Sequence, residues 1–233
     1  MAPLTITVNG TSRLTRPAER GVMNISVEAE GTDKELVSLQ VTSASNEMHK
    51  LFTELSPKTE AGIATAEAAV THFSSTMLRS WHQTPRGSDG IAVARVYHAS
   101  SSITATFRNF AAMNDIAGKL ILNPHVHIKS IDWELTDATI QSLGQESRKL
   151  AMRDAIQKAE DYADVIGRKV VVTEINSGGY SGDLNVRCMM ATAPGGALFG
   201  RSSPAPEHDS LDLTPQEIKI EGSVSVKFES ETA

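Results

Sequence analysis

Alternation of apolar and polar residues predicts extended strands at both ends of the chain and at several points between them. Near the start, Leu4, Ile6 and Val8 alternate with polar residues, which indicates a half-buried strand over residues 4–14. The same period of two, bounded by turn residues, predicts the remaining strands. These cover about residues 23–30, 70–82, 92–108, 130–135, 169–175, 186–192 and 218–228.

Apolar residues spaced three and four apart predict three helices between these strands. The helices cover about residues 32–56, 110–122 and 137–166. In the first, Thr32 and Glu35 form a capping box. Its apolar stripe is Val37, Val41, Ala44, Met48, Leu51 and Leu55.

The third helix has small residues on its inward face and a clear end. Ala151, Ala155 and Ala159 recur every four residues, so this helix can lie close on a sheet. Gly167 is expected to end it in a left-handed conformation. Asp154 and Lys158 have the i,i+4 spacing of an ion pair, and we interpret that pair as part of a solvated face.

The order of elements predicts the fold class and the domain organisation. We expect an α+β fold in which long mixed or antiparallel strands are packed by the three helices. Residues 1–233 are expected to form a single domain. Within it, residues 70–136 are a strand-strand-helix-strand segment that could make a semi-independent lobe.

Composition and charge narrow the range of partners. The net charge of −6, with no local cluster of Lys and Arg, argues against nucleic acids and anionic membranes as partners. No apolar run approaches the ~18 residues of a membrane span. The segment from Met1 enters a strand pattern directly, which predicts a chain without a secretory signal. A single cysteine, Cys188, suits a reducing compartment, so we expect a cytoplasmic protein.

The motifs of the common enzyme classes are missing from the sequence. It contains no Gly-x-Ser-x-Gly, no Walker loop and no Gly-x-Gly-x-x-Gly. The Gly-rich stretch 177–182 follows a strand without opening a helix, so we interpret it as a turn. Cys188 stands beside Met189 and Met190, and a buried, inert thiol is the better interpretation. We therefore assign no catalytic residue and no cofactor. The sequence favours a protein that is not an enzyme.

Two histidines are weak candidates for metal ligands. His125 and His127 are two residues apart, so a strand would place both imidazoles on one face. This face continues through Lys129 to Ile131 and Trp133 and offers no carboxylate. The favoured interpretation is two half-exposed histidines, and we predict no metal site.

The segment 193–216 is a long loop rich in Pro, Gly and Ser. It contains Leu198 and Phe199, which would be exposed in a flexible setting. Loops of this length are uncommon unless they are functional or disordered. Leu198 and Phe199 could contact a partner or a second subunit, or the loop could act as a lid. The alternative is an excursion without a function between two strands.

Several segments occur in a recognisable order over nearly the whole chain. They are the strand 6–10, the segment 28–31 before a long helix, the aromatic strand at Tyr97, the segment 131–137, and the ending 213–220. The Ala-rich helix adds Arg148, Ala151, Asp154, Ala155, Lys158, Ala159, Ala163 and Gly167. In this order they resemble the SIMPL-domain family, which consists mostly of bacterial envelope proteins and includes some eukaryotic members. The connection 58–69 and the missing envelope signal depart from the family pattern.

The resemblance implies a function only in outline. Members of the family look like non-enzymatic, self-associating proteins linked to stress tolerance or to protein–protein signalling, and no catalytic or ligand-binding positions can be carried over. We expect a homo-oligomeric binding or scaffold protein, with a protein as a possible partner. The alternative is a small-molecule-binding protein or enzyme whose pocket lies between the sheet and the helices, under the loop 193–216.

Overall fold

The computed structural model describes residues 4–84, 94–177, 189–190 and 213–230. Contacts between residues divide the chain into two compact units. The first unit contains residues 1–18, 135–197 and 216–233, and the second contains residues 19–134 and 198–215. Each unit is built from its own antiparallel sheet.

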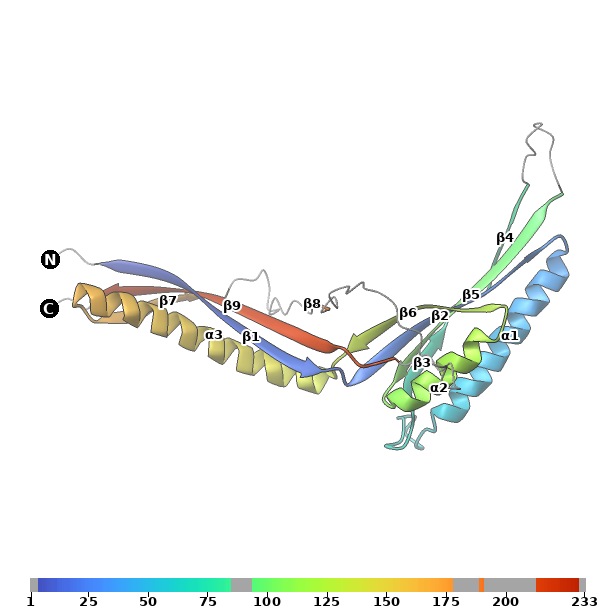
Figure 1. The fold of residues 1–233 in the computed structure, drawn as a ribbon, viewed down its shortest axis with the longest axis horizontal. Coiled ribbons are helices and arrows are strands. Elements are labelled where there is room, and N and C mark those ends of the chain that lie inside the picture. The colour runs from blue at the N-terminus through green and yellow to red at the C-terminus, as the bar shows by residue number, and fades with distance from the viewer. Residues whose placement is uncertain (1–3, 85–93, 178–188, 191–212, 231–233) are drawn as a thin grey trace, which may run out of the picture. The chain divides into compact units, whose positions relative to one another are not determined.

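The first unit is a sheet covered on one face by a long helix. Its strands are β1 (Thr5–Pro17), β9 (Glu217–Ser230) and β7 (Val170–Asn176), in the order β1-β9-β7. The short β8 (Met189–Met190) also pairs with β9. The helix α3 (Asp137–Ile166) runs along the sheet (Figure 1).

Small residues let α3 lie directly on the strands. The core of this unit consists of Val8, Ala155, Ala159, Val226 and Phe228. A Cβ at Gly10 would collide with the carbonyl oxygen of Ala151. A side chain at this position would therefore push the helix away, and the predicted small inward face is confirmed.

Local signals fix both ends of α3. The Thr136 hydroxyl accepts a hydrogen bond from the Thr139 amide and caps the first turn. Gly167 adopts a φ of 66° and closes the last turn, as the sequence predicts.

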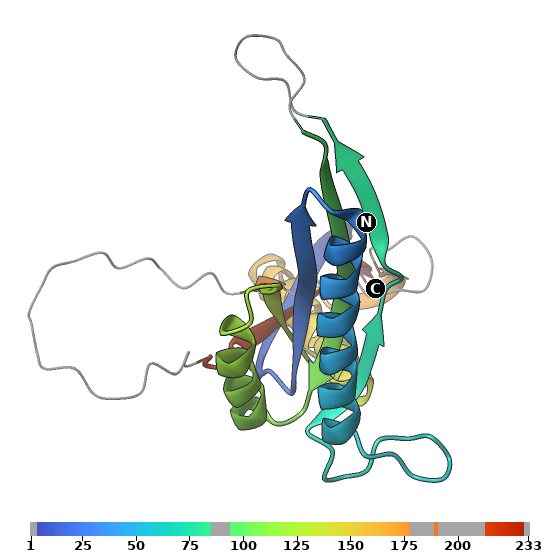
Figure 2. The same ribbon diagram turned by 90° about the vertical axis from the view of Figure 1, so that its right-hand side faces the viewer.

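The second unit has helices on one face of a larger sheet. The strand order is β3 (Val70–Ser75), β5 (Val96–Phe107), β2 (Arg20–Gly31) and β6 (Val126–Glu134), and β4 (Arg79–Gln83) also pairs with β5. The helices α1 (Lys34–Leu55) and α2 (Phe110–Ile121) lie over the same face (Figure 2). Every strand pair in the described residues is antiparallel.

The packing of α1 corrects two details of the sequence prediction. Asp33, and not Thr32, is the N-cap, because its carboxylate accepts hydrogen bonds from the amides of Glu35 and Leu36. Toward the end of α1 the fully buried side chain is Phe52, whereas Leu51 and Leu55 are only partly buried. Phe52 packs against Phe73 and Phe107. Because of these contacts with rings of the sheet, Phe52 is the buried residue at this end of the apolar stripe.

The α+β class is confirmed, and one predicted strand needs correction. The stretch 70–82 is two strands, β3 and β4, because the regular pairing with β5 is interrupted at residues 76–78. Of the stretch 186–192, the described part is β8 alone. None of the described helices is long and apolar enough to cross a membrane.

Candidate functional site

The face of the second unit's sheet opposite α1 and α2 is polar and open. Residues of β2 alternate, so Met23 and Ile25 are buried under the helices while Asn24 lies on the other face. The Asn24 amide donates to Ser130 Oγ at 3.0 Å and to Asp132 Oδ2 at 2.8 Å, and the Thr104 hydroxyl donates to Asn24 Oδ1 at 3.0 Å. The middle of this face is therefore a ladder of satisfied polar groups across three strands.

A hollow of about 370 Å³ lies beyond this ladder and collects three imidazoles. Its lining residues are Glu28, Ala29, Glu30, Trp81, His98, Ala99, Pro124, His125 and His127. They come from β2, β4 and β5 and from the start of β6, and all belong to the second unit.

One wall of the hollow is a stacked pair of rings. The Trp81 and His98 rings are 5.3 Å apart and nearly parallel, with an interplanar angle of 10°. On the other side of His98, its Nδ1 lies 3.4 Å from Glu30 Oε2. Trp81, His98 and Glu30 are direct partners in the ladder, so the backbone register holds the three side chains in one row.

A β-bulge places the other two imidazoles on the same face. The register between β2 and β6 shifts between Asn24 and Ile25, which leaves Lys129 as an extra residue in β6. The extra residue reverses the alternation of β6. His127 therefore lies opposite Ser26 on the open face, while Ile131 and Trp133 point to the helices. The expectation that His127 shares a face with these two residues is wrong.

The same bulge brings carboxylates to the histidines, contrary to the sequence analysis. Glu28 lines the hollow with His125 and His127, and its amide donates to the His125 carbonyl at 2.8 Å. The Lys129 ammonium, 3.1 Å from Glu28 Oε1, is the main cause that lowers the pKa of Glu28. Burial opposes this effect. Glu28 is therefore an ionised carboxylate with a cation already beside it.

The imidazoles do not converge on one point. Within the described ranges, no three His, Cys, Asp or Glu side chains are placed to hold one metal ion. The hollow brings His125 and His127 near a carboxylate, but Lys129 occupies that carboxylate. The absence of a metal site remains a prediction.

The spaces between α1 and the sheet are smaller. One, of about 200 Å³, is lined by Ser45 and His49 of α1 and by Thr76 and Ser101 from the sheet side. Another, of about 100 Å³, lies near Val37 and Tyr97. Binding pockets for drug-sized ligands have volumes of about 300–1,000 Å³. Of these hollows, the one on the open sheet face falls in that range.

The second candidate surface is the edge of the first unit's sheet at β7. β7 pairs with β9 on one side, and no described strand pairs with its other side. Its apolar side chains are accessible: Val171 is 44% exposed, Val172 40% and Ile175 57%. Among the described residues, this edge thus combines backbone groups that no strand pairs with and accessible apolar side chains.

Comparison with known families supports the resemblance found in the sequence. A family model described as SIMPL, a protein of unknown function (DUF541), matches residues 6–228. The chain belongs to the SIMPL family. No curated protein matches it.

The SIMPL match runs from β1 into β9, so it spans both units and both candidate surfaces. The description of the family assigns no function. The candidate contact residues Leu198 and Phe199, and also Cys188, lie outside the described residues.

Glu28, Glu30, Trp81 and His98 line one hollow that the sequence pattern does not predict. His98 and Glu30 each lie on a strand that the sequence predicts, but the pairing of those strands is not visible in periodicity. Trp81 and His98 meet because β4 pairs with β5 next to β2. An aromatic side chain left outside an apolar stripe is the signal that could have drawn attention to Trp81.

Proposed function

We propose that this SIMPL chain is a non-enzymatic binding protein that self-associates, and that the sheet edge at β7 is the contact. The observation that carries the proposal is the accessible apolar edge strand of the first unit. Unpaired strand edges are templates for another chain, and proteins usually cover them or protect them with charges. At β7, the exposed residues include Val171, Val172 and Ile175, and Glu174 is the one charged residue of the strand.

The apolar side chains are spread over both faces of this edge. Val172 and Ile175 lie opposite Phe228 and Val226, so they extend the apolar face that packs under α3. Val171 lies opposite Glu229 on the other face. A register shift at Thr173 divides the strand into two short runs. A partner is therefore expected to gain as much from apolar contact as from backbone hydrogen bonds.

The two carboxylates with shifted pKa values support a role without catalysis. A catalytic acid or base usually has a pKa shifted by burial in a cleft. The pKa values of Glu28 and Asp154 are both lowered, and in each case the first cause is a hydrogen-bonded lysine. Such shifts are typical of ion pairs that stabilise structure.

Size exclusion coupled to light scattering at micromolar concentration tests the proposal. We expect a dimer, because a contact that each copy makes with the same strand closes around a two-fold axis. Val172→Lys should shift the population to monomer. Val165→Lys is the control, because Val165 is a valine that is 87% exposed on α3 and is not part of the β7 strand. Equal masses for the two variants would reject β7 as the contact.

Leu198 and Phe199 remain a second proposed contact, from the sequence alone. If they contribute, the pair Leu198→Asp and Phe199→Asp should also weaken the dimer. The cytoplasmic location also remains a proposal, and the single Cys188 is its main support.

A second candidate function is binding of a small organic cation in the hollow of the second unit. Trp81 is 50% exposed and presents a ring, and Glu30 presents a carboxylate to the same space. An aromatic face beside carboxylates attracts ammonium and guanidinium groups. Quenching of Trp81 fluorescence by methylguanidinium, which should disappear in Trp81→Phe, tests it. No quenching at millimolar concentration would remove this candidate.

A further inference from the structure

The first unit's sheet has its opposite edge at β1, and this edge differs from the β7 edge in its length, its regularity and its contacts with α3. β1 is the longest described edge strand of this sheet, and its register with β9 runs from Thr5 to Pro17 without a shift. Threonines recur along the strand, and β-branched residues favour extended structure. By length, regularity and composition, β1 is the better template for strand addition.

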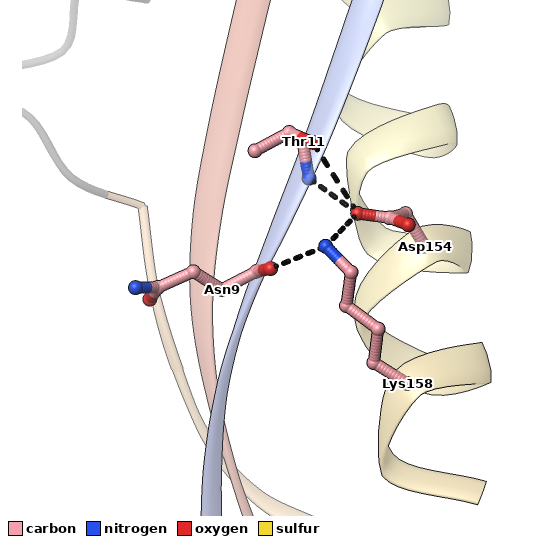
Figure 3. Close-up of polar contacts among 4 residues, drawn as sticks. All are labelled: Asn9, Thr11, Asp154 and Lys158. Atoms are coloured by element: carbon pink, nitrogen blue, oxygen red, sulfur yellow. Dashed lines mark hydrogen bonds and ion pairs between the residues drawn. The ribbon is translucent and has the colours of Figure 1, made fainter. Parts of the chain in front are cut away.

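Two side chains of α3 bond to one amide and one carbonyl in the middle of this edge. The Asp154 carboxylate accepts a hydrogen bond of 2.7 Å from the Thr11 amide, and the Lys158 ammonium donates one of 3.0 Å to the Asn9 carbonyl. The two side chains also pair with each other at 2.7 Å (Figure 3). Gly10, between the two strand residues, lets the helix approach closely enough for both contacts.

The chemistry of the two contacts matches that of a neighbouring strand. In a ladder, a strand supplies an acceptor to an amide and a donor to a carbonyl two residues away. Asp154 supplies the acceptor and Lys158 supplies the donor at that spacing. The i,i+4 ion pair that the sequence predicts on a solvated face is confirmed, and the pair also contacts β1.

We propose that Asp154 and Lys158 cap the β1 edge against a second copy of this chain. The inference rests on the proposed self-association. It adds a reason why copies meet through β7 and not β1, and why assembly stops at a dimer. With β1 capped, copies meet through β7 and assembly stops at a dimer. With the cap removed, each copy offers a second edge, and a chain with two edges grows into larger assemblies.

The test compares three variants by light scattering from micromolar to about 100 µM. Asp154→Ala with Lys158→Ala removes the cap and should give masses above the dimer that rise with concentration. Asp161→Ala is the control, because Gln157 and Asp161 form an i,i+4 contact on the same helix. It should keep the mass of the wild type.

A charge swap separates capping from simple helix stabilisation. Asp154→Lys with Lys158→Asp keeps an i,i+4 ion pair but sets a donor against the Thr11 amide and an acceptor against the Asn9 carbonyl. It should therefore assemble like the double alanine variant. If the swap variant keeps the mass of the wild type, the pair acts only within the helix and the proposal is wrong. The swap variant also provides the result if the double alanine variant does not fold.

Hydrogen exchange at the Thr11 amide completes the test. The amide should be protected in the wild type and exchange faster in both cap variants at low concentration. Fast exchange without any increase in mass, up to 100 µM, would overturn the proposal. If the wild type is a monomer, the self-association proposal fails, while capping still predicts a larger mass for the double alanine variant.

Discussion

Replacing Gly10 by alanine should destabilise the first unit far more than one methyl group suggests. The new Cβ would overlap the Ala151 carbonyl oxygen and lie 2.8 Å from both Cβ and N of Ala155. Carbon atoms in ordinary contact are about 3.5–4.0 Å apart, so α3 would have to retreat by roughly 1 Å. The retreat loosens Ala155 and Ala159 from Val8, Val226 and Phe228, which form the core.

The expected change in the free energy of unfolding is the balance of two opposing effects, overpacking and strand propensity. Overpacking of a core costs about 1–3 kcal/mol, and here the obstacle is a helix backbone, which favours the upper end. Alanine is intrinsically better than glycine in a strand by about 0.5–1 kcal/mol, which offsets part of the loss. We therefore expect Gly10→Ala to lower the free energy of unfolding by about 2 kcal/mol.

Urea denaturation followed by circular dichroism measures this change. Gly118→Ala is the control, because a Cβ at Gly118 meets nothing within 4 Å and the position lies inside α2. That variant should be stabilised by up to about 1 kcal/mol through helix propensity. The two substitutions are chemically identical and should have opposite signs. A loss below about 0.5 kcal/mol for Gly10→Ala would refute the close packing of α3 on β1.

Three further predictions concern the core, metal binding and pH. Ala155→Leu should cost about 1–3 kcal/mol in the same denaturation assay, since Ala155 is fully buried; a neutral effect would show that it does not face the sheet. Elemental analysis of purified protein should find no stoichiometric zinc, nickel or copper, and one metal per chain that is lost in His127→Ala would contradict this. The pKa of Asp154 is lowered first by Lys158 and then by the Thr11 amide. The contribution of the ionised Asp154 side chain to stability should therefore be fully present at pH values above the ordinary Asp pKa of about 3.9. It should disappear as the pH falls through the lowered pKa. An acid limb unchanged in Asp154→Asn would contradict that assignment.

Local signals in the sequence predict most elements of the fold. Gly167 ends α3 because only a residue without a Cβ adopts its positive φ at little cost, and that is visible in the sequence. The alanines every four residues likewise predict the buried face of α3. The N-cap of α1 was misplaced by one residue, because Thr32 and Asp33 are both good capping residues and the backbone decides between them.

Features that depend on pairing between distant strands were not predictable from one sequence. The extra residue at Lys129 reverses which side chains of β6 point to each face of the sheet, and no local sequence pattern indicates it. His127 was therefore assigned to the wrong face, and its neighbour Glu28 was missed. The spacing of Asp154 and Lys158 was visible, but their contact with Asn9 and Thr11 depends on how α3 lies on β1.

The central claim is that this SIMPL chain self-associates through the β7 edge, and the mass of the wild type in solution tests it most directly. Light scattering during size exclusion across the micromolar range should give twice the 25.0 kDa of one chain, and Val172→Lys should return the mass toward one chain. A wild-type mass of 25.0 kDa at every concentration would contradict the account and leave the hollow of the second unit as the better guide to function.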